Sequence, residues 1–300
     1  MRTTTQQDYR NRIRKVLDHI QYHLDEPLDL ETLAGVAYFS PFHFHRLFRL
    51  MVGETLADYI RRQRLKTAAK GLRDGAQVLT AALDNGYETP ESFSRAFKTF
   101  YGVSPSAYAV ADEPPAPKAY DTNLLRGPDG LLLILPESIR RLNMNIEIVT
   151  FQDIPVVYLP HSGSYDDIGT AFQRIIGWAA LKGFMNEDTP SYGRYFDDPE
   201  SVPASELRSQ ACVVIPQGFE GIEASDGVEL GTIAGGIYAK AVHTGPYQNM
   251  KATYDFIYGS WMPDSGSDVE DAPCLERYLN NPEDTPPKDL VTEIYIPLKA

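Results

Sequence analysis

The sequence predicts a multidomain protein: an all-α N-terminal domain with two helix-turn-helix motifs, then an α+β domain of two pseudo-symmetric βαββ units. Helical periodicity runs through the first third, a proline-rich segment follows, and strand patterns dominate after about Met144. A chain of 300 residues is long enough to bury two separate cores. We therefore expect a first domain at residues 1–112, a linker at 113–143 and a second domain at 144–300.

The first domain is expected to consist only of helices. From Tyr9 to Leu24 the apolar residues recur at three- and four-residue steps, which predicts an amphipathic helix that the Asp25–Pro27 segment ends. No strand pattern interrupts the helical patterns that follow. They lie at Leu30–Ala37, Pro41–Met51, Leu56–Gly71, Val78–Leu83 and Pro90–Phe100.

The second domain begins after a segment that cannot continue a helix. Residues 113–120 read EPPAPKAY, and their prolines favour a stiff, extended linker. Beyond it, alternating or β-branched runs are separated by two helical patterns, which indicates an α+β fold. The runs are Ile146–Phe151, Pro155–Leu159, Ala211–Ile215, Gly236–Val242 and Val291–Leu298.

The net charge of −13 is unevenly distributed along the chain. Residues 1–112 hold 15 Lys and Arg against 13 Asp and Glu, whereas the remainder holds 13 against 28. Residues 46–73 alone contain eight basic and two acidic residues. Because electrostatic interactions are screened within roughly 10 Å, such a local basic stripe can neutralise DNA phosphates despite the acidic remainder.

An internal repeat in the first domain points to a duplicated helix-turn-helix. At an offset of 49, the segment 40–49 (SPFHFHRLFR) aligns with 89–98 (TPESFSRAFK). Each copy starts with a hydroxyl residue at the N-cap and a proline at the first helical position. Helical spacing turns the aromatic residues inward and leaves two outward faces: Phe42, His45, Arg46 and Arg49 in the first copy, and Glu91, Ser92, Arg95 and Lys98 in the second.

These two outward faces suit the major groove of DNA. Arginine reads guanine through two hydrogen bonds, and hydroxyl or imidazole groups add weaker preferences. Two such helices joined by a long basic helix would enter successive grooves about 34 Å apart. An ordinary solvated helix face is the alternative for either helix taken alone, and the duplication favours DNA recognition.

The region from Leu30 to Ser106 resembles the DNA-binding domain of AraC/XylS-type regulators. The segments that carry the resemblance are 34–48 (AGVAYFSPFHFHRLF), 59–65 (YIRRQRL) and 93–98 (FSRAFK), in the family's order. The resemblance implies base contacts from both recognition helices, here from Phe42, His45, Arg46, Glu91, Ser92 and Arg95. Glu91 departs from a DNA-facing pattern, because a carboxylate repels phosphates and serves equally as a charge at a helix start.

A second repeat, at an offset of 82, shapes the C-terminal half. Residues 161–168 (HSGSYDDI) align with 243–250 (HTGPYQNM), and in each copy a strand leads through this turn into an amphipathic helix. Two such units imply a pseudo-two-fold domain with a cleft between the halves, where small molecules often bind. His161 and His243 occupy equivalent positions and are interpreted as structural.

This half resembles the GyrI-like effector-binding domains found behind AraC-type regulators and, more distantly, the drug-binding domain of some MerR-type regulators. The supporting motifs are 193–199 (GRYFDDP), 208–212 (RSQAC), 243–247 (HTGPY) and 292–298 (TEIYIPL). The resemblance implies βαββ repeats around an aromatic pocket that a glutamate from the last strand faces. In this chain that glutamate is Glu293.

The expected ligand of this pocket is a small, lipophilic and cationic effector. A lone carboxylate in an apolar strand is costly to bury, and a bound organic cation would pair with Glu293. Aromatic side chains would supply flat walls and cation–π contacts of roughly 0.5 to 2 kcal/mol each. The expected walls are Tyr165, Trp178, Tyr192, Tyr195, Phe196, Tyr247 and Trp261. An edge strand with Glu293 in water and ordinary core aromatics is the alternative interpretation.

The sequence thus predicts a cytoplasmic, non-enzymatic transcription regulator that binds double-stranded DNA and an effector and contacts RNA polymerase. One alternative is a GyrI-like hydrolase fused to a DNA-binding domain, although no GxSxG, HExxH or phosphate-loop motif is present. A regulator that binds DNA independently of any ligand is another. Two DNA motifs in one chain favour a monomer.

We expect neither a cofactor nor a metal. His43 and His45 lie two residues apart, so on a helix they do not face each other. Cys212 and Cys274 lack metal-ligand spacing and are interpreted as core thiols. No stretch approaches the ~20 apolar residues of a membrane span.

Overall fold

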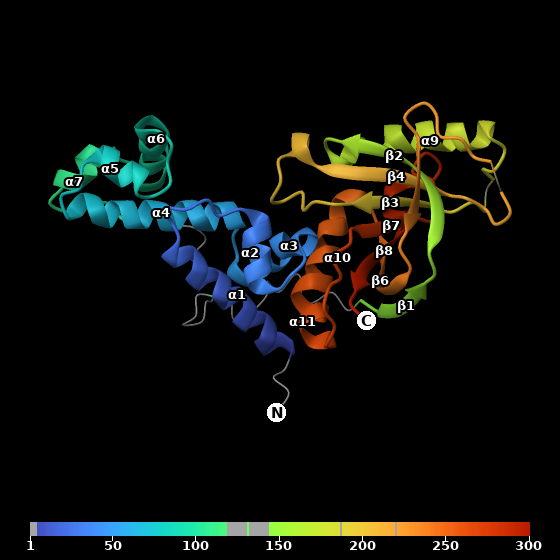
Figure 1. The fold of residues 1–300 in the computed structure, drawn as a ribbon, viewed down its shortest axis with the longest axis horizontal. Coiled ribbons are helices and arrows are strands. Elements are labelled where there is room, and N and C mark those ends of the chain that lie inside the picture. Colours follow the sequence, from blue (N-terminus) through green and yellow to red (C-terminus); the bar gives the residue numbers. More distant parts are fainter. Residues whose placement is uncertain (1–4, 119–130, 132–143, 187, 220) are drawn as a thin grey trace. The chain divides into compact units, whose positions relative to one another are not determined.

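The computed structural model describes residues 5–118, 131, 144–186, 188–219 and 221–300 (Figure 1). These residues form two compact units. The helical unit contains Gln7–Tyr38 and continues from Phe48, whereas the sheet unit contains the segment Phe39–Leu47 together with the C-terminal half. The predicted linker at 113–143 lies outside the described residues from 119 onward, except for Leu131.

In the described residues of the N-terminal part, all regular secondary structure is helical, as predicted. The helix bounds match the periodicity within a few residues, and one short helix, α7, had not been predicted. The helices are α1 (Thr5–Tyr22), α2 (Leu30–Ala37), α3 (Pro41–Val52), α4 (Leu56–Arg73), α5 (Val78–Leu83), α6 (Pro90–Tyr101) and α7 (Pro105–Val110).

The second helix-turn-helix packs around an aromatic core. Thr89 caps α6 by accepting a hydrogen bond from the amide of Ser92 at 3.2 Å. The ring of Phe97 lies 5.4 Å from that of Phe93 and 5.2 Å from that of Tyr108, centre to centre. This packing fixes the inward face of α6 and leaves the opposite face to solvent.

The sheet unit is built on one eight-stranded antiparallel sheet in the order β1-β6-β8-β7-β3-β4-β2-β5. Its strands are β1 (Ile146–Phe151), β2 (Ile154–Ser162), β3 (Ser191–Tyr195), β4 (Arg208–Val214), β5 (Glu229–Ile233), β6 (Gly236–Thr244), β7 (Cys274–Tyr278) and β8 (Val291–Leu298). Helix α9 (Gly169–Leu181) packs on β2 and β4, and α10 (Met250–Phe256) contacts β6. A π-helix, η4 (Ile257–Trp261), and α11 (Met262–Ser265) follow α10.

The two predicted βαββ units are present. The first is β2-α9-β3-β4 and the second is β6-α10-β7-β8, and they meet where β3 pairs with β7. The outer strands are exchanged between the units, because β1 pairs with β6 and β5 pairs with β2. His161 Nε2 lies 3.0 Å from the carbonyl of Ser164, and His243 Nε2 lies 3.3 Å from the carbonyl of Pro246. Both histidines therefore hold equivalent turns.

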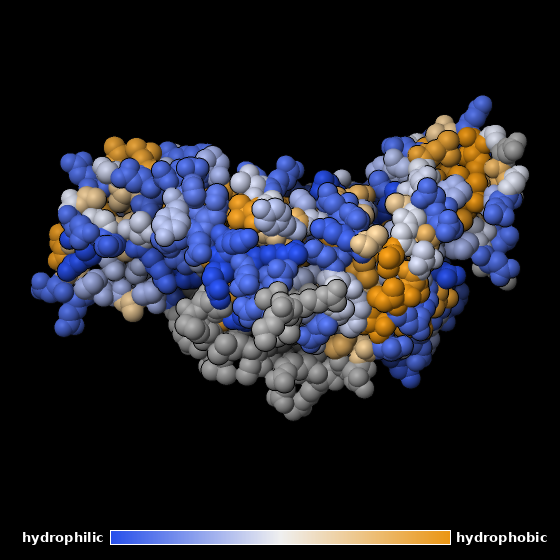
Figure 2. Space-filling model, turned by 60° about the horizontal axis from the view of Figure 1, so that its bottom comes forward, coloured by the Kyte–Doolittle hydropathy of each residue, from blue (hydrophilic) through white to orange (hydrophobic). Residues whose placement is uncertain are grey.

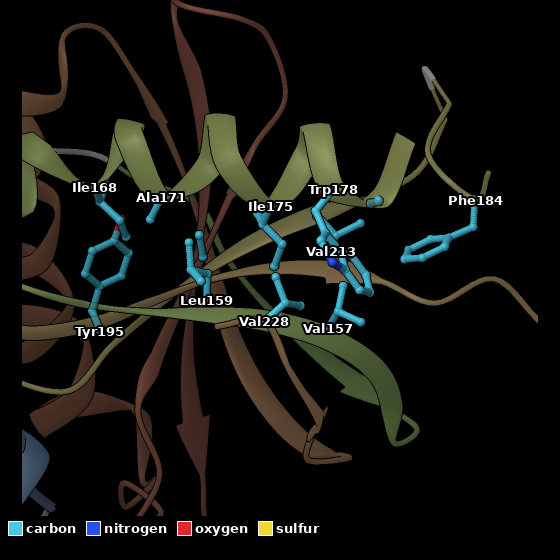
Figure 3. Close-up of a cluster of buried hydrophobic side chains, with 12 residues drawn as sticks. Val157, Leu159, Ile168, Ala171, Ile175, Trp178, Phe184, Tyr195, Val213 and Val228 are labelled. Carbon is cyan, nitrogen blue, oxygen red and sulfur yellow. The ribbon is translucent and has the colours of Figure 1, made fainter. Parts of the chain in front are cut away.

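One apolar core lies between α9 and the strands beneath it (Figure 3). Ile168 and Tyr195 lie near one end of this core, whereas Trp178 and Phe184 lie near the other. Cys212 and Cys274 are buried free thiols, and burial raises the pKa of Cys212 to about 12.

The described residues include no helix with the length and apolar character that crossing a membrane requires. Figure 2 shows apolar patches separated by hydrophilic residues on the face in view. Within the same residues, no group of three or more histidine, cysteine, aspartate or glutamate side chains is arranged to hold a metal ion.

Candidate effector and DNA-binding sites

The acidic centre of the sheet unit is Glu276, on β7. This residue is opposite Gly193 in the register of β3 and β7, at the junction of the two βαββ units. Its side chain is buried, with 4% of the residue exposed. The hydroxyls of Tyr254 and Tyr278 each donate a hydrogen bond of 2.7 Å to its carboxylate. Sequence reasoning missed Glu276, because it stands in no alternating strand pattern.

Five tyrosines, which we call the tyrosine group, form a connected cluster that reaches this carboxylate through Tyr254 and Tyr278. The rings of Tyr165 and Tyr195 lie 4.7 Å apart, and those of Tyr247 and Tyr278 lie 5.4 Å apart. The hydroxyls of Tyr195 and Tyr278, at equivalent places on β3 and β7, hydrogen-bond to each other. The group comprises Tyr165, Tyr195, Tyr247, Tyr254 and Tyr278.

Burial controls the charges at this centre. It raises the pKa of Glu276, while the hydrogen bonds from Tyr278 and Tyr254 and the charge of Arg46 act in the opposite direction. Burial also raises the pKa values of Tyr254 and Tyr278, so their hydroxyls remain protonated donors at neutral pH. A buried carboxylate among aromatic faces has the chemistry of a site for an organic cation.

In this structure the guanidinium of Arg46 lies at this centre. Its central carbon is 4.3 Å from the ring centre of Tyr254 and 5.6 Å from that of Tyr258. Its Nε is 3.5 Å from Asp198, and Nη1 donates to the Cys274 sulfur at 3.4 Å. Only 5% of Arg46 is exposed. The expectation that Arg46 points outward is therefore wrong here, because Tyr254, Asp198 and Cys274 enclose its guanidinium.

Three other residues of the segment Phe39–Leu47 also contact residues of the sheet unit. Ser40 Oγ donates to Asp271 at 2.7 Å. His43 is fully buried, with Nδ1 2.5 Å from the Tyr258 hydroxyl and Nε2 3.0 Å from the carbonyl of Ala272. The rings of Phe42 and Phe196 lie 6.1 Å apart.

His45 and Arg49, the other residues predicted to face outward on α3, are partly buried. Among the described residues, the Nδ1 atom of His45 is buried without a hydrogen-bond partner. Burial lowers the pKa of His45, and the nearby Asp198 and Asp197 oppose that shift. The exposure predicted for this face of α3 is therefore not observed.

The second recognition helix presents its predicted face to solvent. Glu91, Arg95 and Lys98 are exposed on α6, and Ser92 is partly exposed with its hydroxyl donating to the carbonyl of Thr89 at 2.8 Å. Their outward orientation agrees with the repeat analysis. Contacts of these residues with bases stay a prediction.

Several bases of the predicted stripe already have partners in the protein. Arg62 forms an ion pair with Glu54 at 2.6 Å, and Arg61 pairs with Asp58. Arg64 donates to the carbonyls of Leu24 and Glu26, both at 2.9 Å. Arg62 and Arg64 connect α4 to residues outside it, and Arg61 pairs within the helix, so fewer of the charges of α4 are left for phosphates than the composition suggested.

Glu293 does not join the tyrosine group, which corrects the expectation for the acidic residue. Arg277 is opposite Glu293 in the register of β7 and β8, whereas Glu276 is opposite Ile294, so the two glutamates lie on opposite faces of the sheet. The Tyr295 hydroxyl donates to Glu293 at 2.6 Å, and Arg277 and Lys240 lie 3.5 and 3.6 Å away. Glu293 is therefore paired within the protein.

The remaining predicted aromatic residues are divided among different places. Tyr192 packs on the face of Glu293, with its ring 6.4 Å from that of Tyr295. Trp178 packs against Phe184, and its indole donates to Ser225 at 2.9 Å. Trp261 is partly buried on η4. Of the seven predicted aromatic residues, the structure gathers Tyr165, Tyr195 and Tyr247 near Glu276, with Phe196 against Phe42.

Comparison with known proteins matches each half of the chain to a known domain family. A model of the GyrI-like small molecule binding domain matches residues 144–299, and a helix-turn-helix domain model matches residues 33–110. The chain is 31% identical over 157 residues to the DNA gyrase inhibitor of Erwinia billingiae (strain Eb661), covering 52% of this chain and 97% of that protein. It is 37% identical over 101 residues to the HTH-type transcriptional activator AarP of Providencia stuartii, covering 33% of this chain and 75% of that protein.

A solved hydrolase from Listeria innocua shares 14% identity over 52% of this chain and 92% of its own, with a TM-score of 0.40. That likeness is too weak to support any inference about activity.

These matches define the class of protein, a DNA-binding transcription regulator with a small-molecule binding domain. The chain belongs to the GyrI-like family, with an AraC-type helix-turn-helix domain at its N-terminal side. The predicted two-domain fold and regulator class are confirmed.

Proposed function

We propose that this regulator reads DNA through α3 and α6 and binds a lipophilic organic cation at Glu276 and the tyrosine group. The observation that carries the effector part is the buried carboxylate of Glu276, with tyrosine hydroxyls on it and aromatic faces beside it. A cation between these faces gains both charge pairing and cation–π contacts. Glu276 takes the role that the sequence had suggested for Glu293.

The DNA part of the proposal rests on the duplicated motif. Arg95 and Lys98 are exposed on α6, as a major-groove helix requires. Phe42, His45, Arg46 and Arg49 on α3 would read the neighbouring groove once that face is free. The proposed boundaries are 1–112 for the DNA-binding part and 144–300 for the sensor. Effector binding then changes DNA occupancy or contact with RNA polymerase, in the cytoplasm and without catalysis.

Binding of a model lipophilic cation tests the effector site. Titration of the full chain with tetraphenylphosphonium, followed by calorimetry, is expected to show saturable binding. Glu276→Gln keeps the size of the side chain and removes its charge, so we expect a loss of at least about tenfold in affinity, or roughly 1.4 kcal/mol. Glu293→Gln is the matched control, because Glu293 lies on the opposite face of the sheet.

Equal losses in the two variants, or a loss in the Glu293 variant alone, would contradict the placement of the site. The compound should also be recovered chemically unchanged, since turnover would favour the hydrolase alternative. Selection of promoter fragments by the full chain at defined salt tests the DNA part. Absence of any sequence preference would overturn it.

A further inference from the structure

The segment Phe39–Leu47 connects the two proposed sites, because it carries DNA-reading residues and is packed in the sheet unit. We propose that this segment is an internal ligand of the GyrI-like domain, with Arg46 in the place of the effector's cation. This inference rests on the proposed function. A lipophilic cation then competes with Arg46, and its binding releases the first recognition helix for DNA.

The contacts of Arg46 are those expected of a bound cation. Its guanidinium lies over the ring of Tyr254, whose hydroxyl donates to Glu276. The same ring thus links the arginine to the buried carboxylate. A guanidinium is charged at every physiological pH, so its burial requires such aromatic and acidic partners. An external cation that uses the Tyr254 face and Glu276 would take the place of the guanidinium.

Polar contacts made by two residues that precede Arg46 specify the docked position of the segment. Ser40 is hydrogen-bonded to Asp271, and both ring nitrogens of His43 have partners, Tyr258 and the carbonyl of Ala272. These contacts lie within one helical turn. Hydrogen bonds of this kind give specificity beyond apolar packing, because a shifted segment would leave buried polar atoms without partners.

Docking and base reading by this part of α3 exclude each other. Arg46 is 5% exposed in the docked position, whereas a base contact requires its guanidinium to reach a groove edge. A ligand that binds only the undocked form shifts the equilibrium toward that form by linkage. Effector binding is therefore expected to raise DNA affinity rather than lower it.

A reversible covalent lock tests docking directly. In the full chain, Ser40→Cys with Asp271→Cys places two thiols where the hydrogen-bonded side chains lie 2.7 Å apart. We expect the double variant to form a disulfide on mild oxidation, verified by mass spectrometry. Each single variant serves as a control for the native thiols Cys212 and Cys274. Failure of the two introduced thiols to join would overturn the docked arrangement.

The disulfide also distinguishes failure of the docking proposal from failure of the proposed function. Tetraphenylphosphonium is expected to slow formation of the disulfide several-fold, and no effect at saturating compound would overturn the competition. The oxidised double variant should bind a selected promoter fragment at least tenfold more weakly than the reduced one, and equal binding would contradict the inference alone. If neither the oxidised nor the reduced form selects DNA, the proposed function fails. Formation of the disulfide, and its slowing by tetraphenylphosphonium, would still show whether the segment docks and whether the cation competes with it.

A milder variant gives an independent readout without new cysteines. Tyr258→Phe removes the hydroxyl that contacts His43 and keeps the ring beside Arg46. We expect this variant to bind DNA several-fold more tightly in the absence of compound. Tyr158→Phe, which removes a hydrogen bond to Glu229 in another part of the sheet, is the matched control and should leave DNA binding unchanged.

Discussion

The helices α3 and α6 come from one duplicated motif, yet their outward faces have opposite environments. Arg46 of α3 is buried against tyrosines and Asp198, whereas Arg95, at the equivalent place on α6, is exposed. The inward faces remain alike, because Phe48 and Phe97 are both fully buried. Duplication has therefore preserved the packing of the motif while one copy has gained a second binding partner within the chain.

Truncating the shared inward face should affect both copies strongly and equally. Phe48→Ala and Phe97→Ala each leave a cavity where a fully buried ring stood, so we expect losses of about 3–5 kcal/mol in the free energy of unfolding. Urea denaturation followed by circular dichroism measures both. A loss several-fold smaller for Phe48 would break the equivalence of the two inward faces.

Truncating the two outward arginines should separate the copies. Arg46→Ala removes a buried cation from beside Asp198, so we expect a loss of about 1–3 kcal/mol in stability. Arg95→Ala changes an exposed side chain, and its effect on stability should stay within about 0.5 kcal/mol. For DNA binding Arg95→Ala should cost about 1–3 kcal/mol. Thermal denaturation and DNA titration together give both values, and equal stability losses would contradict the burial of Arg46.

Acidification should release α3 and leave α6 unaffected. Burial, with a further contribution from the charge of Arg46, lowers the pKa of His43 from 6.5 to about 3. Hydrogen bonding to the backbone of Ala272 and Glu270 and, to a smaller extent, the charge of Asp268 oppose this shift. The docked form excludes a proton that the undocked form binds below pH 6.5, so docking weakens as pH falls from about 7 toward 3. Between pH 7.5 and 5.5 we expect the docking equilibrium to shift about tenfold.

The rate of disulfide formation in the Ser40→Cys and Asp271→Cys double variant reports this shift, once corrected for thiolate content with a small model thiol. Repeating it with His43→Gln, which does not titrate, is the control. A pH dependence that survives this substitution would assign the effect to another group.

The smallest effect concerns the two helix starts. Thr89→Ala removes the cap of α6 and should cost about 1 kcal/mol of stability without strengthening DNA binding. Ser40→Ala removes the hydrogen bond to Asp271 and should instead raise DNA affinity a few-fold. Chemical denaturation and DNA titration of the two variants measure the contrast. A gain in DNA affinity from Thr89→Ala would contradict the expectation that only the start of α3, and not that of α6, is held by a contact that opposes DNA binding.

Much of the fold could be predicted from local sequence patterns. The three strands that were missed, β3, β5 and β7, show which elements such patterns do not predict. The helices show a 3.6-residue apolar period, and the predicted strands carry alternating or β-branched runs. The central strands β3 (SYGRY) and β7 (CLERY) do not, because helices or other side chains cover both of their faces. The short β5 was also missed, since its glycine and glutamate weaken the strand pattern.

The same limit explains the candidate site. Tyr165, Tyr195 and Tyr247 were predicted because they stand in repeated or family-like motifs. Glu276 sits beside an arginine in the sequence, a pair typical of a surface, and only the register of β7 against β3 and β8 shows that it points inward. Glu293 stood in the clearer alternating strand, but alternation does not say which face of a sheet carries the site.

The exchange of the outer strands has a consequence for how the chain folds. β1 (Ile146–Phe151) completes its hydrogen bonds only when β6 (Gly236–Thr244) has been made, and β5 reaches back to β2. During synthesis β1 therefore stays unpaired until β6 has left the ribosome, although β2, β4 and β5 are made earlier and can already pair. Pairings across such long stretches of sequence form slowly. A product truncated before residue 236 would leave β1 without β6 and β3 without β7, so the first repeat alone is expected to be less stable than the whole domain.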